Sequence, residues 1–162
     1  MTTTTDKIAY ANSAALTITL NSLAASATVG RQATVIDNST NLYDDALVTA
    51  IISTSASALA SPNAVFIYIS GSEDGTNYDQ DSAVMGASDA GYTIDSPTNL
   101  KLARVINCST SSKVYNANFS VAQLFGGVMP RKWTAVVVNN TGQSLLSSGN
   151  SMSYSGITYT NS

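Results

Sequence analysis

Apolar and polar residues alternate with a period of two along much of this chain, as expected for β-strands with one buried face. The alternation is clear in residues 16–20, where leucine and isoleucine alternate with threonine, and again in residues 99–106. Residues 46–54 and 64–69 are rich in the β-branched and aromatic side chains that favour strands. Further strands are expected in the ranges 31–37, 92–94, 133–139 and 152–159.

Turn-forming residues separate the expected strands. The pair Asp74-Gly75 predicts a tight turn, because Gly75 adopts a positive φ without the steric penalty of a Cβ atom. Residues 79–97 have a weak pattern rich in Asp, Ser and Gly, which indicates a long surface loop. One short helix is expected over residues 120–127, between a capping Ser120 and a Gly-Gly stop. About eight short strands and almost no helical periodicity predict an all-β fold, an antiparallel β-sandwich of the jelly-roll kind with at most one short helix.

The length of 162 residues fits a single domain that buries its own core. Residues 1–20 are interpreted as an N-terminal arm or first strand, and residues 21–162 as one β-sandwich domain. The Ser- and Ala-rich residues 53–61 are interpreted as a strand end that leads into a loop, because a linker there would leave too little chain for two cores.

Charged residues make up only 10% of the chain, well below the roughly 25% typical of globular domains, and Ser, Thr and Asn take many of the polar positions. The formal net charge is −3 and the seven basic residues are scattered, which argues against a nucleic-acid partner. The polar N-terminus does not resemble a secretory signal, and no apolar run approaches the roughly 20 residues that span a bilayer, so no membrane partner is expected. A weakly charged surface of this kind suits a protein that packs against neighbouring subunits.

The chain contains no histidine, which excludes serine and cysteine triads, histidine metal sites and histidine acid-base catalysis. The single cysteine, Cys108, has no second cysteine for a disulfide or a CxxC pair and is expected to be a small structural residue at a strand end. Carboxylate chemistry of the glycosidase type is the remaining enzymatic option, but three Phe and one Trp are few for a substrate cleft. We therefore expect no catalytic residue, no bound cofactor and no enzymatic activity.

The acidic residues gather in two places, and one of these has the spacing of a calcium loop. Oxygen-bearing side chains recur there, and the calcium candidates are Asp74, Asn77, Asp79 and Asp81. The segment lacks the glycine and the distal glutamate of an EF-hand in their required places, so we favour a solvated turn instead. Gly126-Gly127 likewise lacks the lysine-serine ending of a phosphate-binding loop and is interpreted as a turn.

Two stretches of the chain carry a family resemblance. Residues 30–48 read Gly-Arg-Gln-Ala-Thr-Val-Ile-Asp-Asn-Ser-Thr-Asn-Leu-Tyr-Asp-Asp-Ala-Leu-Val, and residues 125–133 read Phe-Gly-Gly-Val-Met-Pro-Arg-Lys-Trp. Over residues 22–142 the chain resembles a group of small virion proteins of tailed bacteriophages, in which Gly-Arg-x-x-x-x-x-Asp-Asn-x-x-Asn-Leu-Tyr precedes Phe-Gly-Gly-x-x-Pro-x-x-Trp. The resemblance implies a structural component of a phage particle, with a capsid decoration or cement protein as the preferred role. It brings no catalytic residue, and the Thr-rich N-terminus of this chain departs from the pattern.

As such a protein, the chain is expected on the outer capsid surface of the virion, after synthesis in the host cytoplasm. Its expected partners are the major capsid protein and copies of itself, in a cyclic homo-oligomer such as a trimer, joined by termini and strand edges. Candidate interface residues are Arg31, Asp37, Asp44, Asp45, Arg131 and Trp133. The alternative for Arg31 and the three aspartates is an internal ion pair, and for Trp133 it is a core anchor.

Two other functions remain open from the sequence. A tail, baseplate or fibre-adaptor protein would need the same sandwich with a different partner. A carbohydrate-binding module for host attachment would use Tyr68, Tyr78, Tyr92 and the loop acids.

Overall fold

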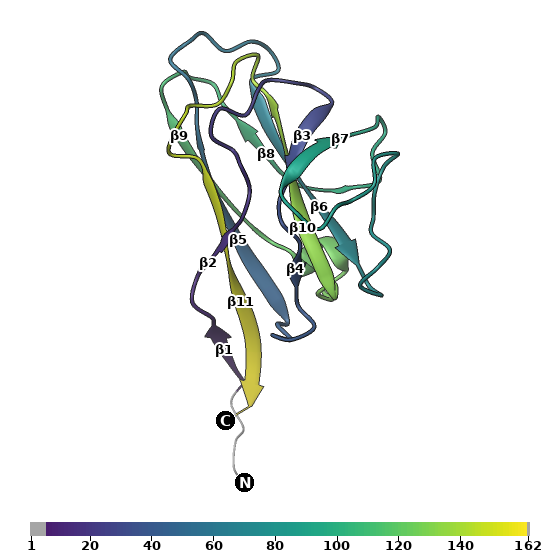
Figure 1. Cartoon of the computed structure of the whole chain (residues 1–162). Coiled ribbons are helices and arrows are strands. Elements are labelled where there is room, and N and C mark those ends of the chain that lie inside the picture. Colours follow the sequence, from purple (N-terminus) through teal and green to yellow (C-terminus); the bar gives the residue numbers. More distant parts are fainter. Residues whose placement is uncertain (1–5, 162) are drawn as a thin grey trace.

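The computed structural model describes residues 6–161 and consists of two antiparallel β-sheets that face each other (Figure 1). The order of strands in the first sheet, sheet A, is β1 (Asp6–Tyr10), β11 (Ser151–Asn161), β5 (Asp45–Ser53) and β9 (Val114–Ser120), with β2 (Ala14–Leu16) also on β11. The order in sheet B is β7 (Ala90–Thr93), β3 (Val29–Gln32), β10 (Lys132–Asn140), β6 (Ala64–Ser72) and β8 (Lys101–Asn107), with β4 (Ile36–Asp37) also on β10.

The order of the strands is that of a jelly roll. If β1 with β2, and β3 with β4, are each counted as one strand and β7 is set aside, eight strands remain in residues 6–161. Sheet A then contains the first, eighth, third and sixth strands, and sheet B the second, seventh, fourth and fifth. This double Greek-key order confirms the all-β antiparallel sandwich expected from the sequence.

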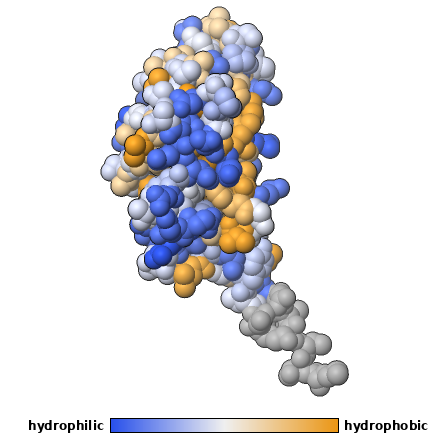
Figure 2. All heavy atoms as spheres, turned by 90° about the vertical axis from the view of Figure 1, so that its right-hand side faces the viewer, coloured by the Kyte–Doolittle hydropathy of each residue, from blue (hydrophilic) through white to orange (hydrophobic). Residues whose placement is uncertain are grey.

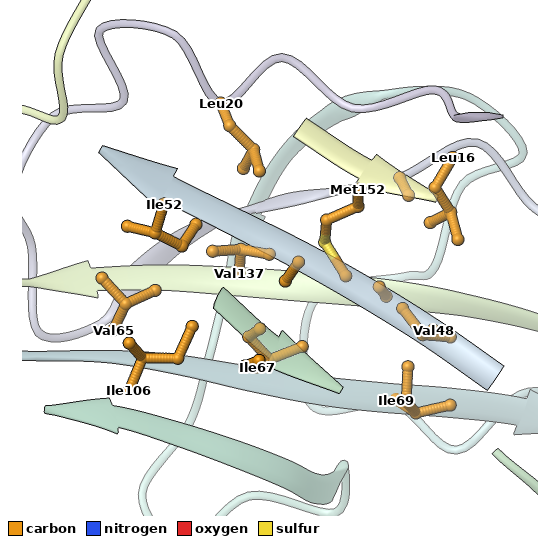
Figure 3. Packing of buried hydrophobic residues seen from close by; sticks show 14 of the residues in the cluster. Leu16, Leu20, Val48, Ile52, Val65, Ile67, Ile69, Ile106, Val137 and Met152 are labelled. Atoms are coloured by element: carbon orange, nitrogen blue, oxygen red, sulfur yellow. The ribbon is translucent and has the colours of Figure 1, made fainter. Parts of the chain in front are cut away.

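The core lies between the two sheets and is built from alternating residues of their strands (Figure 3). Val48 and Ile52 of β5 face Ile67 and Ile69 of β6, and all four side chains are fully buried. Each such side chain contributes about 1.5–3 kcal/mol relative to an exposed position. The packing of these branched side chains therefore holds the sandwich together.

A second, smaller cluster covers the outer face of sheet B. Residues 79–97, which include β7, fold over this face and bury Tyr92 and Met85 against Val136 and Val138 of β10. Strand β10 is therefore buried on both faces, which explains why its sequence is a continuous apolar run rather than an alternating one.

The strand expected at residues 16–20 is shorter than the sequence suggests. Strand β2 ends at Leu16, and beyond it the carbonyl of Thr17 accepts a hydrogen bond from the amide of Thr34 at 2.8 Å. The chain leaves sheet A here, although Leu16 and Leu20 both remain buried in the core. The prediction of a strand over residues 17–20 was wrong because the alternation reports which side chains are buried, not which amides pair.

The strand expected at residues 31–37 is divided by a β-bulge. Gln32 pairs with Val136 and Ile36 pairs with Trp133. Between these two pairs, the three residues 33–35 lie opposite only two residues of β10, 134 and 135. The amide of Ala33 still donates to Ala135 at 2.8 Å. The extra residue bends the strand into β3 and β4 without ending its association with β10.

The remaining expected strands are confirmed as β5, β6, β7, β8, β10 and β11. The expected helix is the short 3₁₀ helix η1 (Ala122–Phe125), which ends at Gly126 with φ 71°. Strand β9 was not expected from the sequence. No helix within residues 6–161 has the length and apolar character needed to cross a membrane.

Candidate interaction surface

One end of the sandwich carries a projecting two-stranded ribbon, formed by β1 and residues 157–161 of β11 (Figure 1). The pairing of β11 with β5 stops at Ile157 and Asp45, so only β1 accompanies the last residues of β11. We call this side of the molecule the ribbon end. Three loops lie there as well: residues 38–44, 73–79 and 126–131. Lys132, which follows the third loop, pairs with Asp37 just before the first loop and with Ser72 just before the second.

The two sequence motifs of the family resemblance meet at the ribbon end, although they are far apart in the chain. Asn38 of the first motif joins them, because its amide donates to the carbonyl of Arg131 in the second motif at 2.9 Å. The Asn38 side chain is buried; its Nδ2 donates to the Tyr43 carbonyl at 3.0 Å, and its Oδ1 accepts from the Tyr43 amide at 3.0 Å. The side chain therefore closes loop 38–43, and the main-chain amide of Asn38 ties this loop to the second motif.

The Phe-Gly-Gly part of the second motif has a packing role. The ring of Phe125 lies against Gly71 at the end of β6, where a Cβ atom on Gly71 would come within 2.5 Å of the ring. Gly126 and Gly127 both have positive φ, and the amide of Gly127 donates to the Ala122 carbonyl at 2.9 Å. The two glycines thus reverse the chain after η1 and present Val128 at the surface.

Tyr43 and Asp44 connect the first motif to the ribbon. The Tyr43 ring packs directly on Gly156 of β11, where any side chain would collide with it. The Asp44 amide donates to the Ile157 carbonyl at 2.8 Å, and the Asp44 carboxylate accepts from the Tyr159 amide at 2.8 Å. The start of the ribbon is therefore fixed to loop 38–44 by main-chain and side-chain bonds.

Large apolar side chains are exposed on this hydrogen-bonded frame. Leu42 is 71% exposed and has φ 51°, a left-handed conformation that is unusual for a bulky residue. Val128 is 66% exposed in the facing loop. On the ribbon, Ile8 and Tyr10 of β1 and Tyr159 of β11 are also exposed, and Ile8 pairs with Tyr159. Figure 2 shows a largely hydrophilic face on the β7 side, with hydrophobic residues in smaller patches at its margins and lower end.

Three open hollows lie along the ribbon end. A hollow of about 450 Å³ is lined by Tyr43, Met129 and Tyr159, so residues of both motifs and of the ribbon contribute to it. A neighbouring hollow of about 380 Å³ lies between Leu42 and Arg131. The third, of about 520 Å³, is lined by Glu73, Asp74 and Asp79 of the acidic loop. The ribbon end is therefore an uneven surface, with hollows between the exposed side chains of its loops.

The calcium candidates do not converge on one point. The Asp74 carboxylate accepts the amides of Asn77 and Thr76, which lower the pKa of Asp74 well below its usual range. Asp79 lies 3.7 Å from the Lys101 ammonium, and Asp81 accepts the Asn99 amide at 2.7 Å. In the part of the chain that the structure describes, no group of three or more acidic, cysteine or histidine side chains is arranged to hold a metal ion. Asp74 and Asp81 instead accept hydrogen bonds from separate loop segments, and Asp79 pairs with Lys101.

Arg31 pairs with a residue that the sequence did not single out. Its Nε donates to the Asp89 carboxylate at 2.5 Å, and Asp89 also accepts the Thr19 hydroxyl at 2.5 Å. Burial tends to raise the pKa of Asp89, but the hydrogen bonds from Arg31 and Thr19 outweigh it and lower that pKa. Arg31 lies at the β3–β7 edge of sheet B, so it is not part of the ribbon end.

The three aspartates expected to accompany Arg31 have other partners. Asp37 lies 3.6 Å from the Lys132 ammonium, and hydrogen bonds from Ser39 lower the Asp37 pKa. Asp45 accepts the Ser120 hydroxyl at 2.7 Å and the Ala122 amide at 2.8 Å. Together with Asp44, these residues stabilise strand ends and loops. The open alternative of an internal ion pair is correct for Arg31 only with Asp89 as its partner, and not with these three aspartates. Arg131 is exposed beside one of the hollows.

Trp133 belongs to the core rather than to a surface. Its side chain is fully buried in the main cluster, and its ring lies edge-on to Tyr154 with centroids 5.5 Å apart. The indole Nε1 has no hydrogen-bond partner among residues 6–161. Trp133 therefore cannot contact a partner in the folded chain, and the core-anchor alternative is the correct one.

Cys108 is buried immediately after β8 and forms no disulfide. Burial raises the pKa of its thiol to about 11. At pH 8 the thiol is therefore neutral as well as inaccessible, and we expect no reaction with a thiol reagent until the chain unfolds. Labelling with a chromogenic disulfide, with and without urea, measures this; complete labelling of the folded chain within minutes would contradict the buried position.

The tyrosines considered for glycan binding are not all accessible. Tyr92 is only 2% exposed, and its hydroxyl accepts the Asp81 amide at 2.9 Å and donates to the Ala83 carbonyl at 3.0 Å. Tyr68 and Tyr78 are half-buried, and Tyr78 lines the acidic hollow. A glycan platform built on all three rings is therefore not present on this surface.

No protein-family model, curated protein or solved structure matches this chain. The function is therefore argued from the residues of the chain and from the surface they form.

Proposed function

We propose that this chain is a non-catalytic structural protein of a tailed-bacteriophage particle, and that it decorates the outer capsid by docking its ribbon end on the major capsid protein. The proposal joins the motif resemblance of residues 30–48 and 125–133 to the surface that their loops, residues 38–44 and 126–131, help to form. The jelly-roll sandwich and the low content of charged residues fit a protein that works by packing against neighbours.

The observation that carries the proposal is the exposure of Leu42 and Val128 on a rigid frame. Asn38 fixes the loop of Leu42, and the Gly126-Gly127 turn fixes the loop of Val128. A fixed loop loses little conformational entropy on binding, which favours association. Leu42 belongs to the first motif and Val128 to the second, so each motif contributes one exposed apolar side chain to the proposed docking surface.

Replacing Val128 by aspartate is expected to weaken binding to particles at least about 10-fold, because a buried apolar contact is replaced by an unpaired charge. The control is Val84→Asp, since Val84 is 77% exposed in the loop over sheet B and lines none of the three ribbon-end hollows. The measurement is co-sedimentation of the purified chain with phage particles that have been stripped of it.

Wild-type and Val84→Asp chains are expected to bind the particles alike, whereas Val128→Asp and Leu42→Asp chains bind weakly. Equal binding by all four chains would remove the ribbon end from the proposal. If the wild-type chain binds only isolated tails, the structural role stays and the adaptor function replaces decoration. If it binds neither heads nor tails, the virion assignment is wrong.

A further inference from the structure

Strand β1 is an edge strand with one free side. It pairs with β11 from Asp6 to Tyr10, and no strand within residues 6–161 lies on its other side. A two-stranded ribbon of this length is marginally stable in water, and an open edge favours pairing with a further strand. The ribbon therefore needs either protection or a partner.

The direction of the main-chain groups in the ribbon follows from its anchoring bonds. The Gly156 carbonyl accepts the Ala11 amide on the β1 side, whereas the Ile157 carbonyl accepts the Asp44 amide on the β5 side. Successive residues of a strand point their amides and carbonyls to opposite sides. Thr158, two residues after Gly156, therefore bonds to its opposite residue, Ala9 of β1.

The free main-chain groups of β1 are those of Ile8 and Tyr10. Because Ala9 points its amide and carbonyl toward β11, its two neighbours point theirs away from the ribbon. On the other side of the ribbon, the Asp44 carboxylate already accepts the Tyr159 amide. Asp44 thus protects the β11 edge, and the β1 edge is left open.

The side chains of this open edge are apolar on one face. Ile8 is 55% exposed and Tyr10 is 63% exposed, and both lie on the same face of β1 because they are two residues apart. They lie opposite Tyr159 and Ile157 of β11. This face is opposite to the one that Gly156 shows to Tyr43, and Ile157 is buried there, so the exposed Ile8, Tyr10 and Tyr159 form an apolar stripe on the outside of sheet A.

We propose that β1 pairs with β1 of a second copy of this chain, antiparallel and centred on Ala9, so that sheet A continues through a two-fold axis. In this register Ile8 of one copy lies opposite Tyr10 of the other, and each of the two pairs exchanges two main-chain hydrogen bonds. The contact joins copies in pairs rather than in trimers. It goes beyond the proposed docking on the capsid and does not depend on it.

Three features of β1 make a second copy the fitting occupant. Aromatic and β-branched residues stabilise each other when they lie opposite in neighbouring strands, as Ile8 and Tyr10 do here. The axis passes Ala9, whose small side chain allows the close approach of about 4.5 Å between Cα atoms in a non-hydrogen-bonded pair. Lys7 lies opposite Ala11 of the other copy, so its charge does not meet a like charge.

The size of the contact indicates that it is weak for an isolated pair. The exposed parts of Ile8 and Tyr10, with the adjoining main chain, amount to roughly 300 Å² per copy, given that a buried tyrosine covers about 150–250 Å². A standard interface covers about 800 Å² per partner. Free chains are therefore expected to dimerise only at high concentration, whereas copies arrayed on a common surface would be joined by avidity.

A cysteine at position 9 tests the pairing and its register. In an Ala9→Cys chain the two Cα atoms are about 4.5 Å apart across the axis, within the range that a disulfide bridges. Mild oxidation is expected to convert most of the concentrated chain into a covalent dimer. The matched control is Thr160→Cys, which is exposed on the same face of the ribbon but lies about 20 Å from its counterpart, three strand spacings across and four residues along the strands. The native Cys108 is buried and does not interfere.

A proline at position 8 supplies the second arm of the test. The Ile8 amide points outward, so Ile8→Pro leaves the bonds between β1 and β11 in place and removes a donor needed only for the pairing. The Ala9→Cys chain is expected to lose its dimer when Ile8→Pro is added, with an unchanged circular dichroism spectrum. Equal cross-linking of Ala9→Cys and Thr160→Cys, or a dimer that survives Ile8→Pro, overturns the proposal. Because the purified chain alone is measured, the result is independent of binding to particles.

Discussion

Replacing Trp133 by alanine is expected to lower the free energy of unfolding by about 3–5 kcal/mol, the usual loss for a large aromatic side chain in a packed core. Trp133 of β10 is fully buried in the main cluster and packs edge-on against Tyr154. A domain of this size is stabilised by only about 5–15 kcal/mol, so the variant is expected to be close to unfolding at physiological temperature. The change is measured by urea unfolding followed by circular dichroism rather than by tryptophan fluorescence, because the variant lacks the only tryptophan of the chain.

The matched control for this prediction is Trp133→Phe. Phenylalanine retains most of the ring packing, and the indole Nε1 that it removes has no hydrogen-bond partner to lose in the described part of the chain. Its cost is therefore expected to be about 1–2 kcal/mol, the part due to lost volume alone. Equal stability of Trp133→Ala and wild type would show that residue 133 does not anchor the core.

Replacing Gly30 by alanine is expected to destabilise the sandwich by about 2–4 kcal/mol, at or above the usual range for overpacking. A Cβ atom on Gly30 would lie 2.6 Å from the Val137 carbonyl oxygen and 2.9 Å from a methyl group of Val138. The nearer of these atoms belongs to the main chain of β10, so it cannot turn away as a flexible side chain would. Strands β3 and β10 would have to separate at this point.

The neighbouring strand offers a control for Gly30→Ala. Gly91 of β7 pairs with Arg31, and a Cβ atom there would meet no other atom within 4 Å. Gly91→Ala is therefore expected to change the stability by less than about 1 kcal/mol, in the stabilising direction, because alanine restricts the unfolded chain. The two unfolding midpoints in urea are compared; a Gly91→Ala loss as large as that of Gly30→Ala would contradict steric contact as the cause.

Much of the fold follows from the sequence because burial in a sandwich imposes a period of two on the side chains. The pattern located β5, β6 and β8 and the Gly75 turn, where φ is 79°. It missed β9, in which Val114, Asn116 and Asn118 face away from the core and Tyr115 alternates with them. Asparagine is uncommon in strands, so composition concealed an alternation that was present.

The pairing of the charged residues was less predictable. The Asp89 partner of Arg31 lies in a loop with no strand pattern, and it is brought to β3 only because residues 79–97 fold over the outer face of sheet B. Sequence spacing contains no signal for such a long-range contact. The two motifs were visible in the sequence, but their meeting depends on Asn38, whose buried side chain bridges loop 38–43.

The location of Leu42 illustrates the same limit. A leucine between asparagine and tyrosine is expected to seek the core, yet here it is held outward with φ 51° by the bonds that Asn38 makes to Tyr43 and Leu42. The conformation is a result of the loop as a whole, not of the leucine. Exposure of an apolar side chain in an unfavourable conformation is a reason to look for a binding partner.

The measurement that tests the account most directly is cryo-electron microscopy of intact phage particles that contain this chain. We expect jelly-roll density on the outer capsid lattice, with Leu42 and Val128 at the contact with the shell. Density confined to the tail or neck, or a lattice position with the ribbon end turned toward solvent, would contradict the proposed docking.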